Sequence, residues 1–136
     1  MIIQAVLFVH FLLPAQIAAS PNPEAARLLQ SAADAESHGN LDQAIADLRK
    51  AVDLDPSSAI ALLKLGDAYF RKQDYGAATQ PLQRAAELSP DSLPGPLAAQ
   101  AYLLLAGIHR RQGESQLAAH DMEEYKRIHS AIDGVK

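Results

Sequence analysis

The sequence predicts an all-α fold, a solenoid of about three helix–turn–helix hairpins preceded by a separate hydrophobic N-terminal segment. Two observations predict the solenoid. Segments 25–58 and 59–92 align without a gap at an offset of 34 residues, and apolar residues within each segment recur at spacings of three and four. Such self-similarity is typical of repeat proteins, in which each unit buries its apolar face against its neighbours.

The composition fits a single domain and excludes several classes of site. The chain has 136 residues, of which 49% are hydrophobic and 21% are charged. The absence of Cys excludes disulfide scaffolds, thiolate metal sites and cysteine nucleophiles. The formal net charge of −4 provides no basic excess that would favour nucleic acid or an anionic membrane as a partner.

Residues 1–19 differ from the rest of the chain, because they carry no charged side chain. The stretch Ile2–Leu13 is nearly all apolar, and Pro14 and a run of mostly small residues follow it. This order predicts a signal peptide cleaved near Ala19, although no Lys or Arg precedes the apolar run. An uncleaved membrane anchor and a buried core helix are the alternatives. A signal peptide implies an exported protein, periplasmic or extracellular, whereas an anchor implies a membrane-attached one.

After a short leader, residues 20–24, the first repeat unit spans residues 25–58 and holds two helices. Gly39 suits the C-terminal end of the first helix, and Asn40 suits the N-cap of the second. Gln43 follows Asn40 by three residues, which completes a capping-box pattern. These signals predict a short turn between two antiparallel helices.

The second unit, residues 59–92, follows the same plan. Gln73 and Asp74 divide its two helices, with Asp74 as the N-cap of the second helix. Each unit closes on a proline shortly after its second helix, Pro56 in the first unit and Pro90 in the second. Both units therefore predict helical hairpins of equal length.

Residues 99–132 predict a third, degenerate hairpin that caps the solenoid. A Pro/Gly insertion, residues 93–98, separates it from the second unit, and its prolines bar helix formation until Leu97. Tyr125 stands where the repeat pattern has a small residue, and Ser130 stands where it has Pro. These departures indicate an end unit rather than a regular repeat.

Small residues recur at fixed positions of the repeat and predict close packing of the paired helices, because a missing side chain lets two backbones approach. These and the other repeat positions are Ala32, Ala44, Ala51, Pro56, Gly66, Tyr69, Ala78, Ala85, Pro90, Ala106 and Ala118. With small residues at positions eight, twenty and twenty-seven and Pro at thirty-two, the sequence resembles the tetratricopeptide repeat (TPR) family. The segment Leu65–Tyr69 is especially similar to the first-helix signature of that family.

The resemblance implies a concave groove lined by the first helix of each unit, with ligand contacts at positions two, five, nine, twelve and thirteen. The residues expected to bind a ligand there are Leu29, Glu36, Ile60, Leu63, Asp67, Phe70, Arg71, Leu103, Arg110 and Arg111. Leu29 and Ala33 stand where some chaperone-binding members carry Lys and Asn to hold a C-terminal carboxylate, so the sequence lacks that clamp.

The apolar middle of this groove favours an amphipathic helix or a short apolar peptide as the ligand. Two alternatives remain open. In the first alternative, the groove leucines pack between adjacent first helices instead of binding a ligand. In the second, another copy of the chain covers the apolar run 102–105 in a homo-oligomer.

No pattern in the sequence predicts catalysis, a cofactor or a metal site. The histidines are not spaced as metal ligands, and we expect His109, His120 and His129 to be solvated on helix faces. The glycines form no phosphate-binding motif, and no Gly-x-Ser-x-Gly sequence is present. The sequence therefore predicts a non-catalytic protein- or peptide-binding module that acts as an exported scaffold. The alternatives are a self-associating structural subunit and a docking accessory of a larger enzyme or secretion complex.

Overall fold

The computed structural model describes residues 22–88 and 95–134, and this part of the chain forms six α-helices. They are α1 (Pro23–Ser37), α2 (Leu41–Leu54), α3 (Ala59–Arg71), α4 (Tyr75–Glu87), α5 (Pro96–Arg111) and α6 (Ser115–Asp133). The predicted signal peptide, residues 1–19, and the repeat position Pro90 lie outside the described residues.

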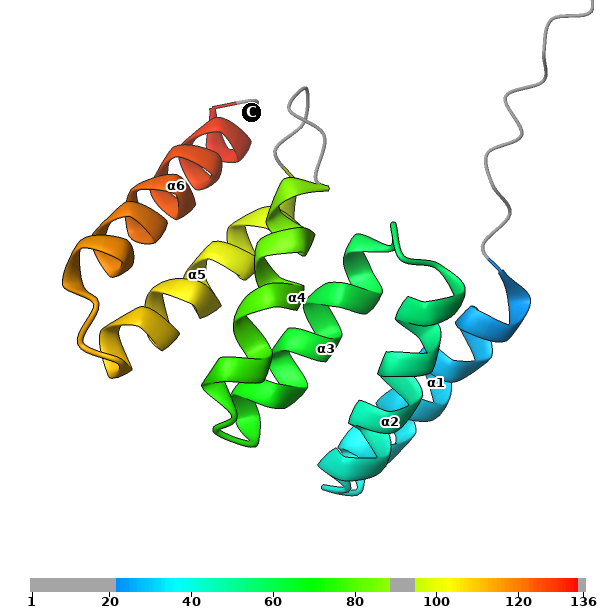
Figure 1. Cartoon of the computed structure of the whole chain (residues 1–136). Coiled ribbons are helices and arrows are strands. Elements are labelled where there is room, and N and C mark those ends of the chain that lie inside the picture. Colours follow the sequence, from blue (N-terminus) through cyan, green and yellow to red (C-terminus); the bar gives the residue numbers. More distant parts are fainter. Residues whose placement is uncertain (1–21, 89–94, 135–136) are drawn as a thin grey trace, which may run out of the picture.

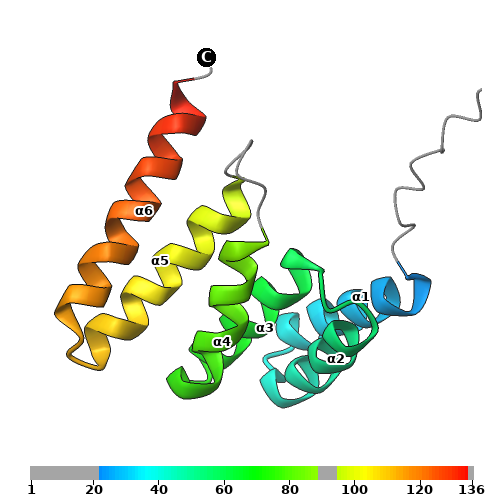
Figure 2. The same ribbon diagram turned by 45° about the horizontal axis from the view of Figure 1, so that its top comes forward.

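The helices form three antiparallel hairpins that stack in a row from α1 to α6 (Figure 1). Within the row, α3 packs against α2, and α5 packs against both α4 and α3. Figure 2 shows the same succession from another direction, with α1 and α2 at one end and α5 and α6 at the other. The all-α solenoid of three hairpins predicted from the repeat is confirmed.

The turns of the first two hairpins form as their cap residues predict. Gly39 has a φ of 74°, a left-handed conformation that suits glycine after a helix. The Asn40 side chain accepts a hydrogen bond of 3.2 Å from the Gln43 backbone, and Asp74 caps α4 in the same way. The capping box is only half formed, because the Gln43 amide donates to Asp47 at 3.0 Å rather than back to the cap residue.

The core lies along the seams between hairpins and depends on the small positions. Ala32 and Ala44 are buried together in a cluster shared by α1, α2 and α3, and Ala78 is buried in a second cluster shared by α3, α4 and α5. At Gly66, an added Cβ would lie 2.4 Å from Cγ of Leu82, which has no exposed surface. Gly66 is the only glycine among the repeat positions of the described residues. The backbone of α3 therefore approaches α4 closely at this residue.

The third hairpin departs from the expected boundaries at both ends. α5 begins at Pro96, one residue before the predicted Leu97, because a proline at the first helical position lacks only an N–H that would have no helical partner. α6 is 19 residues long and continues through Ser130, since no proline stops it there. The large Tyr125 packs beside a small cluster that contains Ile128, between α6 and the start of α5.

Candidate functional site

The C-terminal ends of α1, α3 and α5 bring predicted groove residues from the three hairpins into contact. The Glu36 carboxylate oxygen Oε1 lies 3.6 Å from Nη1 of Arg71. The Arg111 guanidinium lies 5.1 Å from the centre of the Phe70 ring. In each case position twelve of one unit meets position thirteen of the next unit. We call these four residues the first-helix row.

Aromatic packing fixes the second half of the first-helix row. The rings of Phe70 and Tyr75 meet edge to face, with centroids 5.7 Å apart, and Arg111 lies over both rings. The Phe70 ring packs beside Gly107, where an added Cβ would lie 3.4 Å from a ring carbon, an ordinary van der Waals contact. The row therefore presents one ion pair and one cation–π stack beside half-buried aromatic surface.

The other predicted groove residues fall into two groups. Ile60 and Leu103 are each 44% exposed, and Asp67 and Arg110 also reach the surface. Leu63 is only 4% exposed and lies in the core cluster shared with α5. Its side chain packs between adjacent first helices, so it forms part of the scaffold beneath the groove. Leu29 is half-buried and packs against the cluster shared by α1, α2 and α3.

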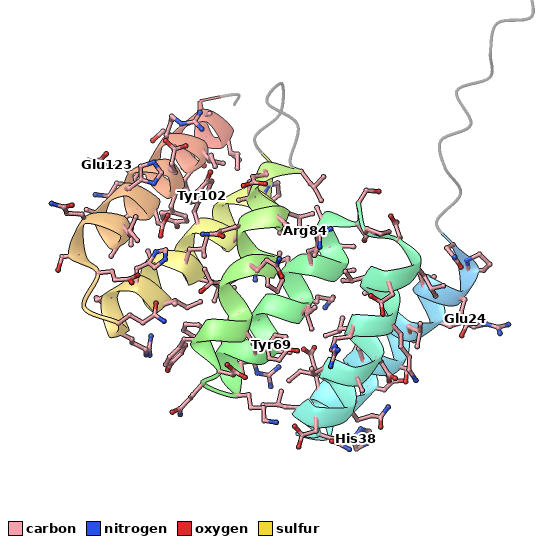
Figure 3. The ribbon with its side chains drawn as sticks, in the orientation of Figure 1. Glu24, His38, Tyr69, Arg84, Tyr102 and Glu123 are labelled. Atoms are coloured by element: carbon pink, nitrogen blue, oxygen red, sulfur yellow. The ribbon has the colours of Figure 1, made fainter. Side chains whose placement is uncertain are left out.

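Two clefts open between successive hairpins beside the second helices. The first, of about 480 Å³, lies between α2, α3 and α4, and Tyr69 and Arg84 line it (Figure 3). The Arg84 guanidinium donates a hydrogen bond of 2.7 Å to the Pro56 carbonyl, which ties the second hairpin to the end of the first. The second cleft, of about 340 Å³, lies between α4, α5 and α6 and includes Tyr102.

His109 lies in the wall of the second cleft and contradicts the expectation of a solvated histidine. It is 6% exposed, and its Nδ1 lies 2.6 Å from a carboxylate oxygen of Asp121, which is 6% exposed. Because an ionised carboxylate only accepts hydrogen bonds, Nδ1 carries the proton. The other ring nitrogen lies 3.7 Å from Glu114. This pair joins α5 to α6 and is a structural interaction that the sequence analysis missed.

A second buried aspartate occupies the same repeat position in the first hairpin. Asp47 is 4% exposed and accepts hydrogen bonds from Ser31 at 2.7 Å and from Gln43 at 3.0 Å. The corresponding residue of the second hairpin is Pro81, which is buried inside α4. In the sequence, the apolar Pro81 at this position of the second unit was the one signal that could have predicted burial of the two aspartates.

Among the described residues, the pKa values of Tyr102, Lys72 and Glu124 are shifted. Burial raises the pKa of the Tyr102 phenol above its ordinary value. The hydrogen bond to Asp42 raises the pKa of Lys72, and this pair links α2 to the turn after α3. The hydrogen bond from Arg127 lowers the pKa of the Glu124 carboxyl on α6. These shifts follow local hydrogen bonds and burial, as in many non-catalytic proteins.

The described ranges, 22–88 and 95–134, contain neither a candidate metal site nor a helix that could span a membrane. No group of three or more His, Asp or Glu side chains there is placed to hold a metal ion. No helix in these ranges is long and apolar enough to cross a bilayer.

Comparison with known proteins agrees with the repeat pattern and the fold. A family model described as tetratricopeptide repeat matches residues 29–92. Two relatives from Drosophila melanogaster, named Hsc70-interacting protein 1 and Hsc70-interacting protein 2, are each 31% identical over 101 residues. The aligned part covers 74% of this chain and 25% of each relative, so the chain spans about a quarter of their length. Residues 29–92 of this chain are therefore similar to the tetratricopeptide repeat family.

Proposed function

We propose that this chain is a non-catalytic interaction module that binds a protein or peptide partner on the face formed by α1, α3 and α5. The observation that carries the proposal is the contact of Glu36 with Arg71 and of Phe70 with Arg111. These contacts support a continuous surface across three hairpins, where a partner meets side chains from all of them.

An exposed apolar residue on this face provides its binding anchor. Ile60, Asp67 and Arg71 are spaced by seven and four residues, so they lie on one side of α3. Ile60 is 44% exposed, which leaves its apolar surface free for a partner. An apolar contact flanked by an acidic and a basic group suits an amphipathic helix, which presents both kinds of side chain.

Replacing Ile60 with Asp is expected to weaken partner binding at least tenfold, because the substitution removes an apolar contact and buries a charge in the complex. The matched control is Leu54→Asp at the end of α2, where the leucine is also 44% exposed but lies on a second helix. Circular dichroism verifies that both variants keep the fold, and isothermal titration calorimetry measures binding. Equal weakening by the two substitutions would contradict a site on the first helices.

Two probes are suited to finding the partner. A purified Hsc70 chaperone is the first, because the two relatives are named for interaction with Hsc70. Leu29 and Ala33 replace the Lys and Asn of the carboxylate clamp, so we expect any chaperone contact to be retained when the C-terminal residues of the chaperone are removed. An extracytoplasmic extract is the second probe, since the N-terminal segment favours export.

We further propose that residues 1–19 are a signal peptide and that the mature protein is exported. The support is the uncharged apolar run followed by small residues. Expression of the full chain in its natural host, followed by mass spectrometry of the intact protein, should give a product that begins near Ser20 outside the cytoplasm. A full-length product in the membrane fraction would instead identify an anchor, and one in the cytoplasm would reject both.

A further inference from the structure

The outer side of the last hairpin carries an apolar groove that the other described residues, 22–88 and 95–134, leave open. This groove, of about 400 Å³, lies between α5 and α6. These two helices form the hairpin at the end of the row (Figures 1 and 2). We call the groove between them the terminal groove, and its main lining residues are Leu103, Gly107, Arg110, Ala118, Ala119 and Met122. Its lining therefore combines small residues with larger side chains.

The same repeat positions are covered in the preceding hairpin. Leu103 corresponds to Leu63, which lies 40 residues earlier in the second unit. Leu63 is 4% exposed because α5 packs over it, whereas Leu103 is 44% exposed. Met122 likewise corresponds to Leu82, which has no exposed surface in its own hairpin. The terminal groove thus continues an interface that α5 already fills one hairpin earlier.

The helices that fill the two earlier grooves share one pattern of apolar residues. Positions three, seven and ten of each are buried: Ala61, Leu65 and Ala68 in α3, and Ala101, Leu105 and Ile108 in α5. Their spacing is i, i+4 and i+7, which places them on one helix face. A helix that fills the terminal groove therefore needs small or branched apolar residues at this spacing.

The charge of Arg110 predicts one further residue of a helix that binds in the terminal groove. Position twelve of one hairpin contacts position thirteen of the next helix twice in this chain, as Glu36 with Arg71 and as Phe70 with Arg111. Position twelve of the last hairpin is Arg110, whose side chain is exposed. In the described part of the chain, no carboxylate forms an ion pair with it. An occupant with Asp or Glu at position thirteen, which is i+10 of the apolar pattern, would supply the missing partner.

We propose that the terminal groove binds an amphipathic helix of a partner protein, with apolar residues at i, i+4 and i+7 and an acidic residue at i+10, as an added first helix of the solenoid. A second copy of this chain does not offer such a helix at its own open end. There, α1 presents Arg27, Ser31 and Asp34 at the three apolar positions. The terminal groove shares Leu103 and Arg110 with the residues predicted on the face formed by α1, α3 and α5, but α6 forms its other side.

The test uses two synthetic peptides that copy residues 95–112, the α5 sequence that fills the equivalent groove. Both carry Gln in place of Leu103, so that the peptide does not itself present the groove leucine, and they differ only in having Arg or Glu at position 111. Titration into the ¹⁵N-labelled protein, followed by two-dimensional NMR, detects weak binding and locates it. We expect saturable shifts at Leu103, Gly107 and Met122, and binding about fivefold tighter for the Glu peptide, as for a modest ion pair.

Variants of the protein distinguish the proposal from other outcomes. Arg110→Glu should reverse the order of affinity, so that the Arg peptide binds more tightly than the Glu peptide. Leu103→Asp should abolish binding of both peptides. Leu117→Asp is the matched control, because Leu117 is 50% exposed on α6 but does not line the groove, and it should leave binding unchanged. The proposal would be overturned if neither peptide changed the NMR chemical shifts of the protein. It would also be overturned if the Glu peptide still bound more tightly than the Arg peptide to the Arg110→Glu variant. A concentration-dependent dimer that Leu103→Asp dissociates would overturn it as well, since a second copy would then be the occupant.

Discussion

Replacing Gly66 with Ala is expected to lower the free energy of unfolding by about 2 kcal/mol. The added Cβ would lie 2.4 Å from Cγ of Leu82, the branch point of a side chain with no exposed surface, so the side chain or the backbone must shift. The higher helix propensity of Ala recovers about 1 kcal/mol at most, so the steric cost dominates. Urea unfolding followed by circular dichroism gives the difference directly.

Gly76→Ala is the matched control for this prediction. Gly76 is also helical, but the nearest atom to an added Cβ is an Asp74 carboxylate oxygen 4.0 Å away. This variant should therefore keep or slightly raise the stability. If Gly66→Ala proved as stable as the control, α3 and α4 would not depend on close backbone approach at the small positions.

Replacing His109 with Leu is expected to cost about 3 kcal/mol of stability. The substitution fills most of the volume of the imidazole but leaves the buried Asp121 carboxylate without the hydrogen bond of 2.6 Å that it accepts from Nδ1. His120 Nδ1 remains 3.6 Å from the other Asp121 oxygen, too far for a hydrogen bond, and a buried carboxylate that loses its hydrogen bond costs far more than the net contribution of the pair itself. Thermal and urea unfolding of the variant should both show the loss.

Two further variants separate the loss of the buried pair from a general effect of removing histidine. His129→Leu, at an exposed pair with Asp133 in α6, should change the stability by less than about 0.5 kcal/mol. Combining His109→Leu with Asp121→Leu should restore much of the lost stability, because two apolar side chains then pack together. A double variant as unstable as His109→Leu alone would show that packing volume, not the charge, controls this site.

The sequence was sufficient to predict the elements whose signals are local or periodic. The 34-residue offset predicted the first two hairpins, and a weaker pattern in residues 99–132 predicted the third, because helical spacing and turn residues act over a few positions. Gly39 and Asp74 mark turns that form as expected, since left-handed backbone and side-chain caps depend only on neighbouring residues. The small positions Ala32 and Gly66 likewise predicted close helix pairing. Each of these predictions depends on short stretches of chain.

Only the tertiary structure determined which residues at equivalent repeat positions are buried and which are exposed. Leu63 and Leu103 share one repeat position, yet a following helix buries the first and leaves the second 44% exposed. His109 and Asp121 lie on different helices, and neither residue has a local signal for the hydrogen bond that joins them. Burial and pairing depend on which groups meet in space, and for these residues the meeting groups come from separate helices. The sequence therefore determined the repeating unit, while the stacking of units determined which surfaces remain available for binding.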